Sequence, residues 1–288
     1  MMSARFLTVV LERAFNMRDG FGREIDYMRI SVIDSCNLNC YYCNPCDNNE
    51  HCHALNILSV KEVLCIVRAA TRLGIKHFRL TGGEPLLHPQ LDEMVLQIKK
   101  IPGVSSVSLT TNAVLLAQHA KWLKEAGIDS INVSLDTIDA SEYERITKKP
   151  LLEEVKHGIN AAIECGIRVK INVVLTPQTD VVALTRYVAK KGTDIRFIEM
   201  MPVGEGHTNG VEPYKKVIGT LSKLYGEPCR INTEKTKEIN SGNDKRKIPD
   251  NGPAEYYIFP ELGIRVGLIQ AIHGKFCDTC NRIRVTAD

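Results

Sequence analysis

The sequence lacks any apolar run of the roughly 18 residues that a membrane-spanning helix needs. It also lacks a large charge imbalance, because 37 basic and 34 acidic residues leave a net charge of +3. So small a balance does not indicate nucleic-acid binding by overall charge, although a local arginine cluster for a nucleotide stays open. The N-terminal stretch MMSARFLTVVLERAFN has no small-residue cleavage pattern, and Glu12 and Arg13 interrupt it. We therefore expect a cytoplasmic protein with no membrane association, an organelle-transit segment being the alternative.

Cysteine, in contrast, is abundant. Ten cysteines in 288 residues are too few for a disulfide scaffold and more than a cytosolic enzyme usually carries. An apolar share of 44% and a charged share of 25% are typical of a soluble globular protein. Under reducing conditions, clustered cysteines more often bind metal than form disulfides, so their spacing indicates their role.

A repeated unit runs through most of the chain. Five times a helical pattern ends at a glycine, and a short β-branched or apolar run follows. Glycine just past a helix end closes the last turn in the left-handed conformation, and a short apolar run is typical of a buried parallel strand. The glycines are Gly74, Gly103, Gly127, Gly166 and Gly192. The predicted helices are Val60–Leu73, Leu91–Lys100, Gln118–Ala126, Leu152–Cys165 and Val181–Lys190.

With the run Met28–Ile33 at the front, the pattern predicts an α/β fold of six strands, each followed by a helix. Six such units fit either a partial (βα) barrel or a doubly wound sheet, and both gather functional groups at the carboxyl ends of the strands. After Lys216 the pattern indicates a small C-terminal extension. Its predicted parts are a helix at Val217–Tyr225, a polar loop over 235–254, and a hairpin of Tyr256–Phe259 and Ile264–Ile269.

The loop after the first strand carries Cys36, Cys40 and Cys43 in a C-x3-C-x2-C spacing. Three thiolates on one loop suit three corners of an iron–sulfur cubane and leave its fourth iron without a protein thiolate. An open iron can bind a small molecule, which favours catalysis over electron storage. Structural zinc is the alternative, because Cys46, Cys52 and His53 lie close in the sequence, although zinc usually takes ligands in two pairs.

The loop after the second strand reads Thr81-Gly82-Gly83-Glu84-Pro85. Its two glycines let the backbone approach a ligand closely, and Glu84 offers an acceptor for an ammonium group or a packing partner. Alone this sequence indicates no more than a tight turn. Because it follows a C-x3-C-x2-C loop by one βα unit, however, the sequence is a strong indication of a ligand-binding loop.

These two motifs resemble those of the radical S-adenosylmethionine (SAM) superfamily, whose fold is a partial (βα)6 barrel. In order, FGREIDYMRISVIDSCNLNCYYC, FRLTGGEPLL, SLTTN, INVSLDT, KINVV, RFIEMMPVG, GPAEYY and FCDTCNRIRVTAD are similar to segments of the GTP 3′,8-cyclase family. The resemblance runs from about Phe21 to the last residue. It implies a lyase of molybdenum cofactor biosynthesis, in which a 5′-deoxyadenosyl radical takes the hydrogen at ribose C3′ of GTP and C3′ then bonds to C8.

The resemblance also implies roles for individual residues. Cys36, Cys40 and Cys43 would hold the [4Fe-4S] cluster that cleaves SAM. The residues implied to contact SAM are Tyr42, Gly83, Ser134 and Met201. Those implied to contact GTP are Arg29, Arg79, Thr110, Lys170, Arg282, Ile283 and Arg284. Arginine and lysine suit a triphosphate through charge-assisted hydrogen bonds, whereas singly each would be read as a salt-bridge residue.

A second cluster is implied at the C-terminus, where Cys277 and Cys280 form a C-x2-C pair. In the family a third cysteine further on completes this second [4Fe-4S] site, whose open iron binds guanine. Here the sequence ends at Asp288, before that position. Three explanations stay open: the sequence is a fragment, another thiol such as Cys229 completes the site, or the protein cleaves SAM without cyclising GTP.

The resulting expectation has an N-terminal extension (1–20), a radical SAM partial barrel (21–212) and a C-terminal extension with part of a second iron–sulfur site (213–288). Its partners would be GTP, SAM, a reducing electron donor and, downstream, cyclic pyranopterin monophosphate synthase; homodimer formation stays open. Two alternatives are a radical SAM enzyme acting on another substrate, as peptide maturases do, and a non-enzymatic zinc or iron–sulfur carrier. Departures from the family are Ser35, where arginine is frequent, and Ala113, where glycine is usual. Cys65 and Cys165 fall in helical patterns, which predicts core positions.

Overall fold

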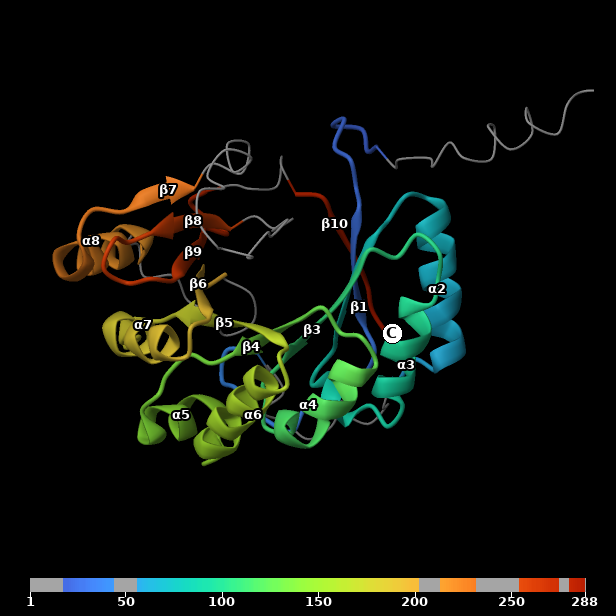
Figure 1. Cartoon of the computed structure of the whole chain (residues 1–288), viewed down its shortest axis with the longest axis horizontal. Helices are drawn as coiled ribbons and strands as arrows, with labels where there is room; N and C mark the ends of the chain where they lie inside the picture. The colour runs from blue at the N-terminus through green and yellow to red at the C-terminus, as the bar shows by residue number, and fades with distance from the viewer. Residues whose placement is uncertain (1–17, 44–55, 202–212, 232–253, 275–279, 288) are drawn as a thin grey trace, which may run out of the picture.

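The computed structural model describes residues 18–43, 56–201, 213–231, 254–274 and 280–287, and all of its strands belong to one curved sheet (Figure 1). The order across the sheet is β10-β1-β2-β3-β4-β5-β6-β9-β8-β7. The strands are β1 (Tyr27–Ser31), β2 (His77–Thr81), β3 (Ser106–Thr111), β4 (Ser130–Ser134), β5 (Arg168–Leu175), β6 (Asp194–Glu199), β7 (Cys229–Ile231), β8 (Glu255–Ile258), β9 (Arg265–Ile269) and β10 (Arg282–Val285).

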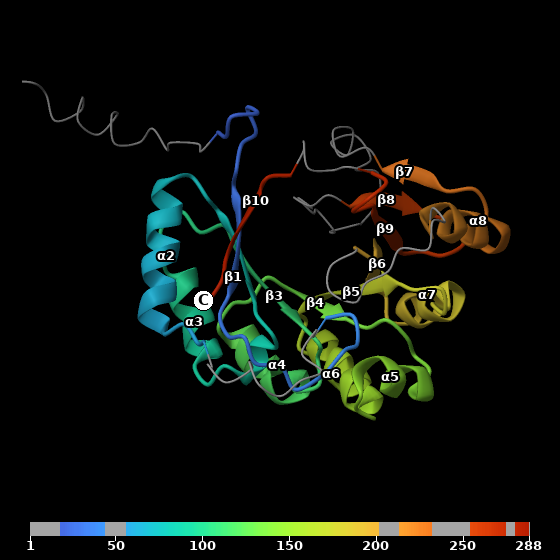
Figure 2. The same ribbon diagram turned by 180° about the vertical axis from the view of Figure 1, so that it is seen from behind.

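This strand order decides between the two predicted folds. Strands β1 to β6 are neighbours in chain order and all parallel, with no point at which the order reverses. A doubly wound sheet would reverse its order and carry helices on both faces. Here the helices line the outside of the curved sheet in both views (Figures 1 and 2). The fold is therefore the partial barrel. The described residues form no helix long and apolar enough to cross a membrane.

The helices are α2 (Val60–Arg72), the short 3-10 turn η1 (Pro85–Leu87), α3 (Leu91–Lys99), α4 (Leu116–Glu125), α5 (Ala140–Thr147), α6 (Leu152–Glu164), α7 (Val181–Lys190) and α8 (Pro213–Tyr225). Of these, α2, α3, α4, α6 and α7 lie close to the bounds predicted from the glycine rule, and α8 begins earlier than predicted, whereas η1 and α5 were not predicted. All five predicted glycines have positive φ, between 63° and 92°. Ala113 also has a φ of 65°, which gives a physical reason for glycine being usual at that position in similar sequences.

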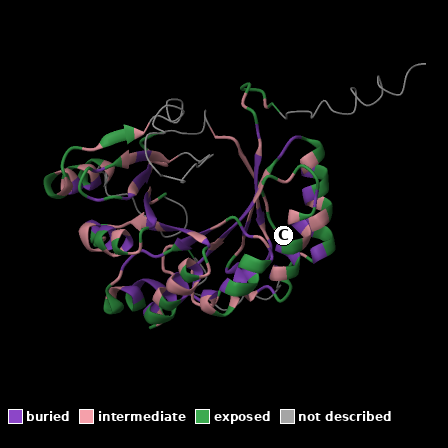
Figure 3. Ribbon diagram, in the orientation of Figure 1, coloured by how far each residue is buried: buried purple, intermediate pink, exposed green. Residues whose placement is uncertain are grey.

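The two faces of the sheet differ in polarity. On the face that packs against the helices, apolar side chains such as Ile30, Phe78 and Leu109 are fully buried. Figure 3 shows the exposed residues on the outer sides of the helices. On the opposite face, here called the lumen face, the register aligns Arg29 with Arg79 and Ser108. The parallel strands therefore have one buried apolar face and one face on which polar groups can lie.

The predicted C-terminal extension does not form a separate layer. The predicted hairpin is confirmed as β8 and β9, which pair antiparallel. However, β9 also pairs parallel with β6, and β10 pairs parallel with β1 at the far edge of the sheet. The C-terminal segment thus adds strands at both ends of the barrel sheet. The division at residue 213 stays a prediction.

Candidate active site

The loop that carries Cys36, Cys40 and Cys43, here called the cysteine loop, follows the carboxyl end of β1. The last turn of helix α5 supports this loop. The amide of Asn39 donates to the carbonyl of Thr147 at 3.0 Å, and the amide of Tyr41 donates to the carbonyl of Ile146 at 3.1 Å. These two carbonyls belong to the last turn of α5, which Lys148 ends with a φ of 60°. The free carbonyls of a helix end thereby become acceptors for the loop. Helix α5, which the sequence analysis did not predict, is the platform of the cysteine loop.

The glycines of the second loop pack against the cysteine loop. The amide of Gly83 donates to the Ile33 carbonyl at 2.7 Å, and that of Glu84 donates to the Ser35 carbonyl at 2.8 Å. A Cβ atom at Gly83 would lie 2.3 Å from the Ser35 oxygen, and one at Gly82 would lie 2.2 Å from the Ile33 oxygen. Glycine is therefore required for backbone-to-backbone packing here, a reason that the sequence analysis did not give. Gly83 itself remains exposed beside the cysteines.

Glu84 is a structural link, and its carboxylate is fully used inside the protein. It is 1% exposed and accepts from the Thr111 hydroxyl at 2.7 Å and from the Asn112 amide at 2.7 Å. It also caps η1 through the Leu86 amide at 3.0 Å. Burial raises the pKa of Glu84, and these three donors oppose that shift. Of the two roles suggested for Glu84, the structure shows the packing role.

Asn112 connects the end of β3 to the cysteine loop. Its side-chain Nδ2 donates to Asn37 Oδ1 at 2.7 Å and to Cys36 Sγ at 3.8 Å. The amide of Leu38 also donates to Cys36 Sγ, at 3.5 Å. Hydrogen bonds to cysteine sulfur are one of the means by which proteins set the potential of an iron–sulfur cluster. Asn112 lies in the SLTTN segment, yet it was not among the predicted site residues.

Tyr42 and Asp136 join the cysteine loop to β4. The Tyr42 hydroxyl donates to Asp136 Oδ2 in a short contact, and the Val174 amide donates to Asp136 Oδ1 at 2.7 Å. Burial raises the pKa of Asp136 to about 6, against the effect of both donors. Cys40, Tyr42, Ser134 and Asp136 share the lining of one cavity of about 40 Å³. The structure thus brings the predicted Ser134 next to the cysteine loop. Asp136 is a further site residue that the sequence analysis missed.

We expect Asp136→Ala to lower the free energy of unfolding by about 1–3 kcal/mol, since it leaves two partly buried donors without their acceptor. Chemical denaturation of the cluster-free protein measures this change. The matched control is Asp139→Ala, which removes an exposed cap of α5 and should cost about 1 kcal/mol. A loss for Asp136→Ala no larger than that of the control would contradict the proposed anchoring.

A cluster of arginines lies on the lumen face of β1, β2 and β10. Arg29 is level with Arg79 on one side and with Arg284 on the other. Burial, together with the charges of Arg282, Arg284 and Arg196, lowers the pKa of Arg29 to about 10. Burial likewise lowers the pKa of Arg282, which Arg79 lowers further. The predicted arginines of the N-terminal and C-terminal segments therefore form one strongly positive site, to which an anion is the natural ligand.

The basic site continues on β5 and β6. Lys170 is 5% exposed and lies level with Asn132 and, through it, with Thr110. Arg196 is also buried and donates to Asn132 Oδ1 in a short contact. Arg29, Arg79 and Lys170 each lie at the third position of their strand. The three residues therefore lie on the predicted strands but before their carboxyl ends, since side chains along the whole strand can face an open lumen. Arg196 was not predicted.

The remaining predicted residues are placed as follows. Met201 follows β6 and is exposed. Ile283 packs against the hydrophobic core, so only its backbone can face the arginines. Cys280 lies two residues before the start of β10, whereas Cys277 lies outside the described residues. Cys229 lies in β7, at the opposite edge of the sheet from β10 and well apart from it in Figures 1 and 2, which speaks against Cys229 completing a site with Cys280.

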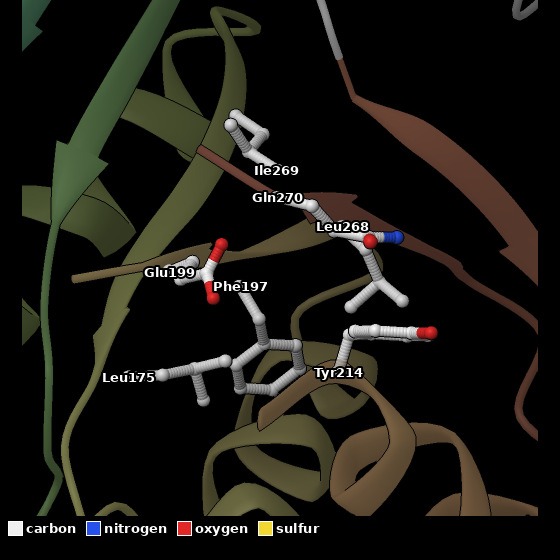
Figure 4. A pocket seen from close by; sticks show the side chains of 7 residues that line it. All are labelled: Leu175, Phe197, Glu199, Tyr214, Leu268, Ile269 and Gln270. Atoms are coloured by element: carbon white, nitrogen blue, oxygen red, sulfur yellow. The ribbon is translucent and has the colours of Figure 1, made fainter. Parts of the chain in front are cut away.

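Glu199 ties the segment after β9 to the end of β6. Its Oε2 accepts from the amides of Ile272 at 2.8 Å and His273 at 3.1 Å, and its Oε1 contacts His273 Nδ1. Burial alone would raise the pKa of Glu199, but these donors outweigh it and lower the pKa. Figure 4 shows Glu199 beside an apolar cavity of about 10 Å³, which is too small for a cofactor. This clamp therefore has a structural role, holding the segment after β9 against the end of β6.

The donor set of the cysteine loop fits an iron–sulfur cluster. Burial is the main cause that raises the pKa of Cys36, Cys40 and Cys43, and the neighbouring thiols add to the shift for the first two. Because their pKa values are raised, the three thiols need positive charge nearby to become thiolates, and iron would supply that charge. Among the described residues no three potential ligands converge on a single metal-ion position. A cubane does not require that, since each thiolate binds a different iron. The additional ligands of the zinc alternative, Cys46, Cys52 and His53, lie outside the described residues.

Comparison with solved structures shows the same fold. Methylornithine synthase superposes with a TM-score of 0.56 at 16% identity, covering 79% of this chain and 71% of the other. The protein anSMEcpe with bound AdoMet gives a TM-score of 0.58 at 19% identity, covering 69% and 57%. Streptococcus suis SuiB gives 0.55 at 18% identity, covering 69% of this chain and 46% of the other.

Sequence families agree with this fold and site. The Radical SAM superfamily matches residues 30–184, and the chain belongs to that superfamily. The chain is therefore a radical SAM enzyme, which implies a [4Fe-4S] cluster and SAM. The family Molybdenum Cofactor Synthesis C matches residues 193–288.

Relatives narrow the family further. A GTP 3′,8-cyclase of Clostridium perfringens is 37% identical over 275 residues, which are 94% of this chain and 81% of the relative. One of Listeria monocytogenes is 37% identical over 276 residues, 94% and 80%. The chain belongs to the GTP 3′,8-cyclase family.

Proposed function

We propose that this protein converts GTP to (8S)-3′,8-cyclo-7,8-dihydroguanosine 5′-triphosphate, the first step of molybdenum cofactor biosynthesis. The observation that carries the proposal is the basic lumen between the two groups of cysteines. Cys36 follows the carboxyl end of β1, while Cys280 precedes the amino end of the parallel strand β10. Cys36 and Cys280 therefore lie beyond opposite ends of two neighbouring parallel strands, and a five-residue strand spans about 17 Å. The arginines and Lys170 lie between them.

This arrangement matches what the substrate requires. A nucleoside triphosphate needs several cations for its phosphates, and Arg29, Arg79 and Lys170 lie on three different strands. Arginine binds phosphate oxygens through paired donors. With cluster and SAM bound, the family chemistry supplies a 5′-deoxyadenosyl radical near the cysteine loop. The chain's own task is to hold the ribose of GTP toward that loop and to keep the phosphates in the lumen.

Residue roles follow from this proposal. Cys36, Cys40 and Cys43 would hold the [4Fe-4S] cluster, while Tyr42, Gly83, Ser134 and Met201 would contact SAM. Cys277 and Cys280 would hold a second [4Fe-4S] cluster, and Arg282 to Arg284 would contact GTP. A reducing electron donor and the downstream cyclic pyranopterin monophosphate synthase would act with the enzyme in the cytoplasm.

The direct test is turnover after anaerobic reconstitution with iron and sulfide. Protein, SAM, GTP and dithionite should release 5′-deoxyadenosine together with the cyclised nucleotide. Release of 5′-deoxyadenosine without loss of GTP would indicate a radical SAM enzyme for another substrate. Zinc in the purified protein without a brown chromophore would instead point to a carrier or structural metal protein.

We expect Arg284→Ala to weaken GTP binding by about tenfold or more while SAM affinity stays within about twofold, since one charge-assisted phosphate contact is lost. Equilibrium binding of each ligand to the reconstituted protein measures both. The matched control is Arg230→Ala, which removes an exposed salt bridge with Glu255 on β7 and β8. Equal losses for GTP and SAM would show general damage rather than a phosphate contact.

A further inference from the structure

Tyr27 lies at the centre of the arginine cluster, on the first strand. It is 7% exposed and is level with Arg282 on β10 and with His77 on β2. Its ring stacks on that of His77, with centroids 6.3 Å apart and an angle of 28° between the planes. An aromatic residue so fixed between two strands is a rigid surface for neighbouring side chains.

Two guanidinium groups rest against this ring. The Arg79 Cζ atom lies 5.4 Å from the ring centroid, and the Arg282 Cζ atom lies 5.3 Å from it. Both distances are within the range of a cation–π interaction, which strengthens when the groups are removed from water. The two arginines come from β2 and β10, which are far apart in the sequence but flank β1 on either side.

Ser108 fixes the same group from the β3 side. Its Oγ atom accepts from Arg79 Nε at 3.0 Å and lies 3.5 Å from the Tyr27 hydroxyl. It also donates to the Phe78 carbonyl at 3.3 Å. Arg79 is therefore held by two partners, the ring of Tyr27 and the hydroxyl of Ser108.

The backbone around Tyr27 also seats the C-terminal strand. The amide of Tyr27 donates to the Asn281 carbonyl at 3.3 Å, and Asn281 Nδ2 donates to Asp26 Oδ1 at 2.5 Å. Asn281 lies between Cys280 and Arg282. The residue that seats β10 is thus the one whose ring contacts Arg282.

We propose that Tyr27 is a positioning residue that aligns Arg79 and Arg282 for one anionic ligand, the triphosphate of GTP, and so couples the C-terminal strand to the barrel. This rests on the proposed function. An arginine side chain has many rotamers, and ordering it costs affinity unless the protein orders it beforehand. Two like charges also repel each other, which the negative face of a shared ring partly offsets.

The experiment measures GTP and SAM dissociation constants of the anaerobically reconstituted protein. Tyr27→Leu should weaken GTP binding about tenfold and leave SAM binding within about twofold. Tyr27→Phe keeps the ring and should restore GTP affinity to near that of the unchanged protein. Restored affinity in Tyr27→Phe would show that the ring, and not the hydroxyl that contacts Ser108, supports GTP binding.

A double-mutant cycle distinguishes positioning from general damage. If Tyr27 acts through Arg282, then Arg282→Ala should weaken GTP binding less in the Tyr27→Leu background than in the unchanged protein. Additive losses, or Tyr27→Leu binding GTP as tightly as the unchanged protein, would overturn the inference alone. If the unchanged protein binds no GTP while still cleaving SAM, the proposed function fails, and this inference fails with it.

Discussion

Replacing Cys36 by alanine is expected to abolish SAM cleavage. Only two thiols of the loop would remain, and a cubane with an open iron is retained poorly by two protein ligands. Changes beside a metal site already cost about 10–100-fold in affinity or activity, so loss of a ligand should lower 5′-deoxyadenosine release by at least about 100-fold. Iron and sulfide per chain, with the visible absorbance, should fall in parallel.

The chain offers a matched control for this experiment. Cys65 is an exposed cysteine on helix α2, so the core position predicted for it was wrong, and it has none of the contacts described for the cysteine loop. Cys65→Ala should therefore keep both the chromophore and the release of 5′-deoxyadenosine. Normal turnover of Cys36→Ala would refute the assignment of the cysteine loop as the site of the SAM-cleaving cluster, because the two remaining thiols could not hold the cluster by rearranging.

Local patterns predicted the repeated strand–helix units well, since they report on local conformation, but they did not distinguish a barrel from a doubly wound sheet. A glycine after a helical stretch must lie in the left-handed region, and each of the five predicted glycines does. Cysteines within eight residues must share a loop, wherever that loop lies in the fold. The same reasoning fails for α5, because its sequence ASEYERIT is short and polar and its order depends on packing against α6 and on the cysteine loop.

Long-range pairing could not be read from the pattern. The segment Arg282–Val285 looks like any short strand, and nothing in it indicates that it joins β1 rather than the preceding hairpin. The resemblance assigned Arg29, Arg79 and Arg282 one common role, which stays a prediction, while their common position in the lumen could be found only from the strand register. Asp136 and Asn112 were missed for a related reason, because their importance comes from partners far away in the sequence.

Gly83→Ala is the second substitution for which we expect a large effect, because Gly83 lies where the backbones of the glycine loop and the cysteine loop pack against each other. A Cβ atom there would lie 2.3 Å from the Ser35 oxygen and 2.4 Å from the Asp34 oxygen, whereas ordinary contacts begin near 3.4 Å. Neither obstacle is a flexible side chain, so the glycine loop must move away from the cysteine loop. Two hydrogen bonds between the loops would then break, from Gly83 and Glu84.

We expect Gly83→Ala to cost about 1–3 kcal/mol or more in the free energy of unfolding and to reduce both cluster content and SAM cleavage. Chemical denaturation and iron analysis measure these effects. Gly219→Ala is the control, because Gly219 lies in helix α8 with nothing within 4 Å of its added Cβ, and should stabilise by about 0.5–1 kcal/mol. If Gly83→Ala kept full cluster content, the two loops would not need to touch, and the glycine would then be explained by ligand approach alone.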